Sequence, residues 1–302
     1  MVSIIIPCYN CESFIHRAIQ SVVDQTYKDW ELLLVNNNST DGTQLVLESY
    51  KEKIQNISIF QETKKGAPAA RNKGLKHAKG KWVQYLDADD ELLPQKLEKQ
   101  IQLAELENVD CVIGNAFLVE EKAGILQKTL RPLYNKDIWI GLIKSQLGIT
   151  SAILWKREML EKVQGWNENM TSSQEYDLMF RLLKSGAKAG FDSEVLTLIH
   201  KADSTISKNV NKNKMVDIVD NRVRLRLQIM EYLQSIDQLS PLRKSMAFTY
   251  IYQELRANQI DIKEYERTRL QGASLKIPGK VRLNIFLKDT KRSLFKLYKA
   301  RT

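Results

Sequence analysis

Residues 82–94 read WVQYLDADDELLP, an apolar segment that runs directly into three aspartates. Residues 82–86 have the length and apolar character of a buried β-strand. In extended backbone, side chains two residues apart point the same way, so Asp87 and Asp89 share a face at the end of this strand, with Asp90 beside them. Carboxylates packed so closely raise one another's pKa and repel unless a cation lies between them. The stretch therefore predicts a buried strand with an acidic edge.

A divalent cation would relieve the repulsion at this acidic edge. Hard ions of this kind are held by one or two carboxylates together with the phosphates of a substrate. A simpler interpretation is that Asp89 or Asp90 only begins the turn into the helix predicted from Pro94. That interpretation explains one acid and not three, so the cation site is the stronger expectation.

Strands and helices alternate on both sides of this segment. The expected strands are residues 2–6, 31–35, 57–60, 82–86 and 110–114, and the expected helices are residues 13–25, 43–53, 67–78 and 94–108. Such alternation is typical of an α/β fold with a mainly parallel sheet covered on both faces. Ligands bind such sheets beyond the carboxyl ends of the strands. We therefore expect the polar residues that follow the first, second and fourth strands to converge in one cleft.

The composition is that of an ordinary soluble globular protein. The chain has 302 residues, 43% hydrophobic and 27% charged, enough for one large α/β domain with an appendage or for two domains. No apolar run approaches the roughly 20 residues needed to cross a bilayer, and strand-like sequence begins at Val2. We therefore expect a cytoplasmic protein. The three cysteines, including Cys8 and Cys11, are too scattered for a disulfide framework or a zinc site.

The chain is basic, with 46 Lys and Arg against 36 Asp and Glu and a net charge of +10. This excess indicates a polyanionic partner, such as nucleic acid, an anionic membrane or a phosphate-bearing substrate. Near the C-terminus, only Asp289 opposes a run of basic residues: Lys276, Lys280, Arg282, Lys288, Lys291, Arg292, Lys296, Lys299 and Arg301. Nucleic acid is not favoured, because the chain has no reading motif and no basic stripe interleaved with aromatic residues.

Two common nucleotide-binding motifs are absent from the sequence. A dinucleotide-binding fold would carry G-x-G-x-x-G after the first strand, where this chain reads PCYNCE. The P-loop pattern G-x-x-x-x-G-K-[ST] occurs nowhere. A nucleotide site here is therefore not built on a glycine-rich phosphate cradle, and the diphosphate charge needs another counterweight.

Six motifs, in this order and spacing, resemble the nucleotide-sugar-dependent glycosyltransferases of family 2: VSIIIPCYN, SVVDQTY, VNNNSTDGT, GAPAARNKGL, YLDADD and SSQEYDLMFRL. Members of this family have the GT-A fold, a Rossmann-like and mainly parallel sheet between helices, and invert the anomeric centre. The resemblance covers about residues 2–207. It implies a GT-A catalytic domain over residues 1–207, followed by a helical, basic C-terminal region over residues 208–302.

The resemblance implies a site for a nucleoside diphosphate sugar, with a UDP-sugar as the first expectation. Pro7 and Tyr9, at the end of the first strand, line the nucleoside pocket, and Tyr9 stacks on the base or bonds through its hydroxyl. Arg71 corresponds to a basic residue beside the nucleotide. From the residues alone, Arg71 could equally be a surface arginine on a helix.

The same resemblance assigns the metal ligands. Asp87 and Ala88 begin the D-x-D signature, whose last acid, Asp89, ligates Mg²⁺ or Mn²⁺ together with the diphosphate of the donor. His200 resembles a histidine that often supplies another metal ligand, and an imidazole suits Mn²⁺ better than Mg²⁺. A lone histidine at a strand end is otherwise a hydrogen-bonded surface residue.

The loop VNNNSTDGT, residues 35–43, bears on the base. Asn, Ser, Asp and Gly form turns and cap helices, so the loop could be only a turn, and residues 39–43 are expected to cap the next helix. In the resembled family the loop usually reads like VDDGSTDGT, and its second acid accepts a hydrogen bond from uracil. Asn37 stands at that position and can donate as well as accept, so we expect it to read the base with a weaker preference for uracil.

Two acids lie in TSSQEYDLMFRLLKSG, residues 171–186, where a helix begins. Asp177 stands four residues before Arg181, which predicts a structural ion pair. Ser172 and Glu175 fit a capping box, so the residues alone leave a capping role for Glu175 open. The general base of the family occupies the position that matches Glu175. The resemblance therefore implies that Glu175 takes the proton of the acceptor hydroxyl.

The acceptor site is expected within residues 115–166, a segment that varies with the acceptor in this family. Trp139, Trp155 and Trp166 offer flat faces of the kind that sugars stack on, although core packing explains tryptophans equally well.

Helices are predicted at residues 217–234, 241–257 and 282–300. The last is basic and amphipathic, which suits the anionic inner face of the cell membrane, where lipid-linked glycan acceptors would be found. It could equally dock on its own catalytic domain with a solvated basic face.

The favoured function is an inverting, metal-dependent glycosyltransferase of the hexosyl- or N-acetylhexosaminyl-transferase type. It would act on a glycan or lipid-linked acceptor in the synthesis of bacterial surface polysaccharide, lipid-linked oligosaccharide or glycoprotein glycans. The alternative is a non-catalytic sugar-nucleotide binding module whose donor site the triple asparagine has weakened.

Overall fold

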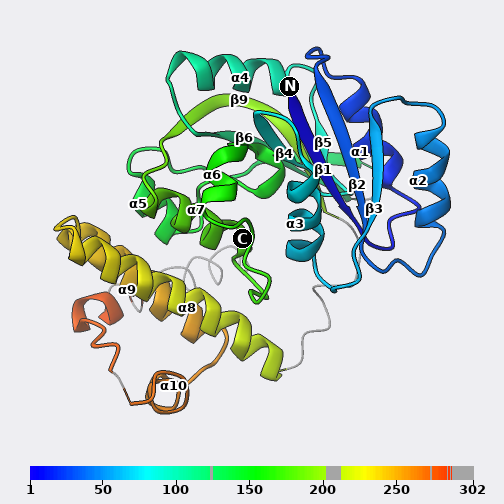
Figure 1. Cartoon of the computed structure of the whole chain (residues 1–302). Coiled ribbons are helices and arrows are strands. Elements are labelled where there is room, and N and C mark those ends of the chain that lie inside the picture. Colours follow the sequence, from blue (N-terminus) through cyan, green and yellow to red (C-terminus); the bar gives the residue numbers. More distant parts are fainter. Residues whose placement is uncertain (123–124, 202–211, 273, 284, 286, 288–302) are drawn as a thin grey trace. The chain divides into compact units, whose positions relative to one another are not determined.

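The computed structural model describes residues 1–122, 125–201, 212–272, 274–283, 285 and 287 (Figure 1). Contacts divide the chain into two compact units. In the described part, the first unit holds residues 1–136, 146–170 and 174–201, and the second holds residues 137–145, 171–173 and those from 212 onward. Each unit thus combines segments that are far apart in the sequence.

In the described residues, nine strands form one sheet in the first unit (Figure 1). The strands are β1 Val2–Cys8, β2 Trp30–Asn36, β3 Ile57–Gln61, β4 Trp82–Tyr85, β5 Glu91–Leu92, β6 Cys111–Lys122, β7 Ile125–Leu130, β8 Ile153–Lys156 and β9 Ala189–His200. Their order across the sheet is β3-β2-β1-β4-β8-β6-β9-β5, and β7 pairs with β6 outside this path.

The part of the sheet from β3 to β4 is parallel. Cys8 at the end of β1 pairs with Asn36 at the end of β2, so these strands end side by side. Ile5 of β1 pairs with Tyr85, which brings the end of β4 to the same edge. The predicted convergence of the loops after these three strands follows from this register.

The rest of the sheet is mixed. β8 lies antiparallel between β4 and β6, whereas β6 and β9 run parallel. β6 extends far beyond the expected residues 110–114. The strand and helix alternation predicted the parallel part, but β8 has only four residues and belongs to no such alternation. A mainly parallel sheet therefore describes β3 to β4, while the sheet as a whole is mixed.

Helices α1 Ile15–Val23 and α3 Ala67–His77 cover opposite faces of β1. Ile4 and Ile6 share a core cluster with Ile15 of α1, whereas Ile5, between them, faces Gly74 of α3. Successive strand residues point to opposite faces, so the sheet is covered on both sides, as predicted. The other elements of this unit are α2 Thr43–Lys51, α4 Lys96–Leu106, α6 Arg157–Lys162, α7 Gln174–Lys184 and a 3₁₀ turn at Thr150–Ala152.

A buried lysine lies between α4 and the sheet. Lys96 is fully buried, and its ammonium donates to the side-chain oxygens of Gln84 at 2.9 Å and Gln100 at 2.5 Å. Gln100 in turn donates to Asp192 at 3.3 Å. Burial lowers the pKa of Lys96 to about 7, because the two amides solvate the charge less well than water does.

The second unit contains α5 Ile138–Ile143, α8 Lys212–Ser235, α9 Pro241–Ala257 and α10 Ile262–Arg269. α9 has the predicted bounds, and α8 begins earlier than expected. Arg226 of α8 is fully buried and donates to the carbonyl of Ile143, and it lies 3.8 Å from the ring of Tyr250. These contacts place α5, which comes from the middle of the sequence, in the same unit as the C-terminal helices.

The basic, amphipathic helix predicted at residues 282–300 falls almost entirely outside the described residues. Residues 279–283 are helical. In the described part of the chain, no helix has both the length and the apolar character needed to span a membrane.

Replacing Gly74 with alanine should destabilise the first unit. An added Cβ would lie 2.4 Å from Cγ2 of Ile5, a fully buried residue that cannot move aside without disturbing the core. We expect a loss of about 1–3 kcal/mol in the free energy of unfolding, measured by urea titration. Gly279→Ala is the control, because among the described residues no heavy atom beyond its chain neighbours and its own helix backbone lies within 4 Å of the added Cβ. Equal effects of the two substitutions would contradict this packing.

Lys96 should make stability depend on pH above neutrality. Its folded pKa of about 7 lies below the unfolded value of about 10.4, so between these limits only the unfolded chain holds the proton. Stability therefore rises with pH in this window, by up to about 1.4 kcal/mol per pH unit.

The Lys96→Met protein should lack this rise. The difference in unfolding free energy between the native and substituted proteins, measured by urea titration from pH 7 to pH 9, isolates the contribution of Lys96. Parallel pH curves would show that Lys96 keeps its proton in the folded protein.

Candidate active site

The loops that follow β1 and β2 are bonded to each other. The amide of Asn10 donates to the hydroxyl of Ser39 at 3.1 Å, and the amide of Thr40 donates to Oδ1 of Asn10 at 2.8 Å. α2 begins at Thr43, as predicted, and the carboxylate of Asp41 accepts from the Thr43 amide at 3.0 Å. Residues 39–43 thus begin the helix and also join the two loops.

The triple asparagine binds the loop between β3 and α3. The side-chain amide of Asn37 donates to the carbonyls of Glu62 at 2.9 Å and Lys64 at 2.7 Å, and its Oδ1 accepts from the amide of Gly66 at 2.8 Å. The amide of Asn38 donates to the carbonyls of Glu62 and Thr63. Each polar atom of the Asn37 side chain is therefore engaged within the protein, and Asn37 is only 6% exposed.

Asn36 bonds to residues that are close to it in the sequence. Its amide donates to the side chain of Gln44 at 2.7 Å, and its Oδ1 accepts from the amide of Ser39 at 3.1 Å. A carboxylate could make the second of these bonds but not the first, because it has no hydrogen to donate. The asparagines that replace the acids of the resembled family thus form bonds that aspartate could not.

Arg71 connects the end of β4 to the start of α7. Its Nη2 lies 2.6 Å from Oδ1 of Asp87, and its Nη1 donates to the side chain of Gln174 at 3.4 Å. The guanidinium also lies 4.5 Å from the ring of Trp166. Arg71 is only 6% exposed, so it is not the surface arginine that the residues alone allowed. It joins the acidic edge to the residue that precedes Glu175.

The three tryptophans considered for the acceptor site are buried. Trp139 is 9% exposed, Trp155 1% and Trp166 2%. Trp166 lies edge-on to Tyr85 at 5.1 Å, and Asn72 bonds its backbone amide and carbonyl. Core packing therefore accounts for all three rings in this structure, and Trp166 contributes to the site by supporting Arg71.

The acidic edge after β4 contains acids of two kinds. Asp90 is 3% exposed and accepts from the hydroxyl of Ser151 at 2.6 Å, so its role is internal. Asp87 and Asp89 are half-buried. Burial, and then the charge of Asp87, raise the pKa of Asp89 above its ordinary value. Ser151 also accepts from the amide of Asp87 at 3.1 Å and so holds this edge in place.

His200 belongs to a cluster that sequence reasoning missed. Its Nε2 lies 2.8 Å from Oε1 of Glu91, and the same oxygen lies 3.2 Å from Nε of Arg17. The guanidinium of Arg17 also donates to the carbonyl of Asp89. Burial, and then the charge of Arg17, lower the pKa of His200. No sequence signal could have indicated this cluster, because Arg17 and Glu91 meet only through the fold.

The start of α7 differs in detail from a capping box. α7 begins at Gln174, so Ser172 stands two residues before the helix and Glu175 is its second residue. The hydroxyl of Ser172 donates to the carbonyl of Ile218 at 3.1 Å. The predicted ion pair of Asp177 with Arg181 is present at 2.8 Å. Glu175 is half-buried and lies one residue from the bond between Gln174 and Arg71.

The remaining predicted site residues lie at the same edge. Pro7, in β1, pairs with Val35 of β2. Tyr9 follows β1, and 51% of its surface is exposed, which leaves its ring accessible for stacking. Ala88 is 8% exposed, so a larger side chain between Asp87 and Asp89 would meet the core.

The acidic residues fit a divalent cation of the kind that is shared with a substrate. In the described residues, no group of three or more His, Cys, Asp and Glu is arranged to hold a metal. One or two carboxylates suffice when phosphates complete the coordination. Asp89 fits this role, since its raised pKa marks a carboxylate whose charge is poorly compensated. Nε2 of His200 is bound to Glu91, so His200 could offer a cation its other ring nitrogen, Nδ1, as in a carboxylate–histidine–metal triad.

Sequence comparison identifies relatives of this chain. Residues 3–164 match the family described as Glycosyl transferase family 2. TuaG of Bacillus subtilis, named for teichuronic acid biosynthesis, is 30% identical over 210 residues, which cover 69% of this chain and 82% of TuaG. WfgD of Escherichia coli, a UDP-Glc:alpha-D-GlcNAc-diphosphoundecaprenol beta-1,3-glucosyltransferase, is 31% identical over 248 residues, 77% of this chain and 92% of WfgD.

Solved structures share the fold. Residues 1–349 of S. aureus TarS, in complex with UDP-GlcNAc, match with a TM-score of 0.63 and 16% identity, over 89% of this chain and 87% of that one. The mannosyltransferase PcManGT of Pyrobaculum calidifontis, in complex with GDP-Man and Mn²⁺, matches with a TM-score of 0.60 and 17% identity. The match covers 100% of this chain and 82% of PcManGT. The fold is therefore of the GT-A type. Because the family match extends through β1 to β8, this protein is a member of Glycosyl transferase family 2.

Proposed function

We propose that this glycosyltransferase inverts the anomeric centre as it moves a hexosyl or N-acetylhexosaminyl group from a nucleoside diphosphate sugar to an acceptor hydroxyl. The single observation that carries the proposal is the chain of contacts from Asp87 through Arg71 to Gln174. It brings the acidic edge, the expected basic residue and the residue before Glu175 together, although they lie on three different elements. The donor, the divalent cation and the general base would all have to lie close together for the sugar to be transferred.

The donor is proposed to be a UDP-sugar, since WfgD, at 31% identity, is named for UDP-Glc. Tyr9 and Pro7 would contact the nucleoside, with the exposed ring of Tyr9 available for stacking. Both amide hydrogens of Asn37 are bound to the loop, so Asn37 would read the base through the second lone pair of its Oδ1, which carries no formal charge. We therefore expect weaker discrimination between bases than a free carboxylate would give.

The diphosphate would be held beside Asp87, Ala88 and Asp89. Mn²⁺ or Mg²⁺, if bound by Asp89, would stabilise the charge that develops on the leaving diphosphate. Arg71 is bonded to Asp87 and so holds a positive charge beside this position. Its pairing with Asp87 fixes the direction of the guanidinium before a donor binds, which lowers the cost of reorganisation.

Glu175 is proposed to act as the general base. The acceptor oxygen would attack the anomeric carbon from the face opposite the diphosphate, its proton would pass to the Glu175 carboxylate, and the bond to the diphosphate would break. Asp177 is unsuited to this role, because its carboxylate is bound to Arg181 and is only 8% exposed.

The acceptor is proposed to be a glycan or lipid-linked sugar of a cell-surface polysaccharide pathway. TuaG is named for teichuronic acid biosynthesis, and WfgD for a diphosphoundecaprenol-linked acceptor. An acceptor of the second kind would place the protein at the cytoplasmic face of the membrane, where the basic C-terminal segment would contact anionic lipid.

Thermal shift with nucleotides tests the donor site. We expect UDP with Mn²⁺ to raise the melting temperature of the full chain, since a ligand at 100 times its Kd adds about 2.7 kcal/mol of stability. Asp89→Asn should lose the part of the shift that depends on Mn²⁺, whereas the exposed control Glu158→Gln should keep it. If neither UDP nor GDP shifts the melting temperature with Mn²⁺ present, the donor site is weakened and the non-catalytic binding module becomes the better explanation.

Substitution of Glu175 tests the general base. Glu175→Gln should bind the donor as well as the native protein does but transfer sugar at least about 10²-fold more slowly, because the amide cannot accept the proton. Asp177→Asn is the matched control from the same helical turn. Its loss of the bond to Arg181 should lower the melting temperature while leaving turnover at low temperature largely intact. Full transfer by the Glu175→Gln protein would refute the assignment.

A further inference from the structure

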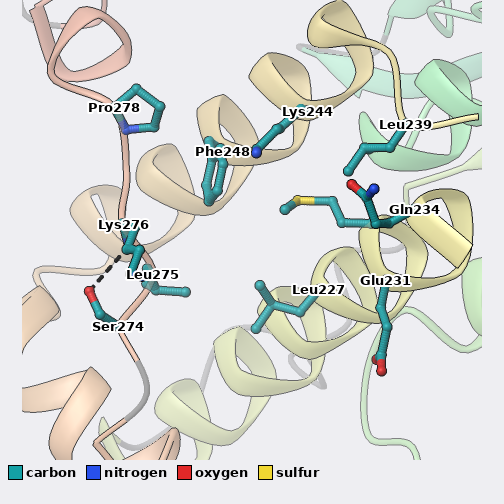
Figure 2. A pocket seen from close by; sticks show the side chains of 11 residues that line it. Leu227, Glu231, Gln234, Leu239, Lys244, Phe248, Ser274, Leu275, Lys276 and Pro278 are labelled. Carbon is teal, nitrogen blue, oxygen red and sulfur yellow. Dashed lines mark hydrogen bonds between the residues drawn. The ribbon is translucent and has the colours of Figure 1, made fainter. Parts of the chain in front are cut away.

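The second unit contains an apolar groove of about 500 Å³ (Figure 2). It lies between α8, α9 and the segment 274–278, and no function proposed above uses it. Six apolar residues line it: Leu227, Met230, Leu239, Phe248, Leu275 and Pro278. In Figure 2 the side chains of Leu227, Phe248 and Leu275 come from three different segments and face a common space. Its volume lies in the range of cavities that hold small ligands.

The charge in the groove is positive. Lys244 and Lys276 line it together with one acid, Glu231, and in the described part of the chain neither ammonium has an acidic partner within ion-pair distance. Figure 2 shows Lys244 extending toward Phe248, while the carboxylate of Glu231 points away from both. An apolar space with two uncompensated cations suits a ligand that has a hydrocarbon part and a negative charge.

A neighbouring hollow differs in that its cations are paired with acids. It has a volume of about 310 Å³ and shares Leu227 and Leu275 with the groove. Its cations, Arg224 and Arg269, are neutralised by acids: Arg224 lies 2.8 Å from Asp220, and Arg269 lies 3.0 Å from Asp217. Of these two hollows, the α8/α9 groove is therefore the one whose cations have no acidic partner among the described residues.

Exposed apolar side chains lie close in sequence to both ends of the groove lining. Ile236 and Leu242 flank Leu239 and are 39% and 53% exposed, and Leu283 and Leu287 follow Pro278 and are 56% and 55% exposed. Side chains of this size are costly to leave in water but are stabilised within the interface of a bilayer. The chain from residue 276 onward is also strongly basic, with Asp289 as its single acid.

We propose that the α8/α9 groove binds one hydrocarbon chain of an anionic membrane phospholipid, with its phosphate between Lys244 and Lys276. The four exposed apolar side chains enter the interface around this lipid, and Lys280 and Arg282 contact neighbouring headgroups. The second unit thereby holds the protein on an anionic lipid surface. The site goes beyond the proposed transfer reaction, and its test does not depend on that activity.

Vesicle flotation with the full chain tests the charge requirement. We expect the protein to float with phosphatidylglycerol vesicles and to remain largely unbound with phosphatidylcholine vesicles. Lys244→Glu combined with Lys276→Glu should reduce partition onto phosphatidylglycerol at least tenfold. The control combines Lys51→Glu with Lys263→Glu, which changes the net charge equally at exposed lysines outside the groove and should have a much smaller effect.

Dodecyl phosphate, below its micelle concentration, tests the chain requirement. It should bind to the native protein in a calorimetric titration, and inorganic phosphate at the same concentration should not displace it. Leu239→Asp places a charge in the groove at a half-buried residue outside the core cluster and should weaken binding at least tenfold. Leu106→Asp, at a leucine that is 87% exposed, should leave binding unchanged. Circular dichroism confirms that each variant is folded.

Three outcomes would overturn the proposal. Equal losses from the two lysine pairs would show a general attraction of charge and no specific site. Complete displacement of dodecyl phosphate by inorganic phosphate would show that the hydrocarbon chain is not held. Binding of an acidic, leucine-rich peptide without binding of phosphatidylglycerol vesicles would assign the groove to a protein partner. Should Leu239→Asp not fold, the lysine pairs and the phosphate competition still decide the question.

Discussion

The rest of the site depends on the ion pair between Arg71 and Asp87. One buried guanidinium joins the end of β4 to α3, lies on the ring of Trp166 and reaches Gln174 at the start of α7. Removing Asp87 would leave the buried guanidinium of Arg71 without its carboxylate, which is destabilising. The segments that it joins are far apart along the chain, and Gln174 stands 103 residues after Arg71. This contact therefore helps to fix their relative positions, together with the bonds of Asn72 to Trp166.

Contacts between segments that are far apart in the sequence also hold the asparagine loop, residues 36–38, in place. Asn37 and Asn38 each donate two hydrogen bonds to carbonyls of residues 62–64, so the loop after β3 is tied to the loop after β2. An aspartate in place of Asn37 would repel the carbonyls of Glu62 and Lys64 and would leave them without its donors. Asn37, which replaces an acid of the resembled family, thus has a structural role, because it binds the loop after β2 to the loop after β3. Any part in reading the base would fall to the second lone pair of the Asn37 Oδ1.

The sequence predicted local features well and long-range partners poorly. The parallel strands, the start of α2 at Thr43 and the pair of Asp177 with Arg181 were all predicted, because each follows from residues close together in the chain. The strand β8 was missed, since its four residues carry no periodic signal. The cluster of Arg17, Glu91 and His200 was also missed, and its bond to Glu91 leaves Nδ1 as the nitrogen of His200 for the expected metal role.

The sequence by itself determined the α/β class, the order of the motifs and the chemical types available at the carboxyl edge of the sheet. These follow from hydrophobic periodicity and turn chemistry, which act over a few residues. Only the tertiary structure decided that Arg71 is buried against Asp87, that three tryptophans are core residues, and that a cationic groove lies between α8 and α9. Burial and charge pairing depend on which distant segments the sheet register and helix packing bring together, and no local pattern encodes that choice.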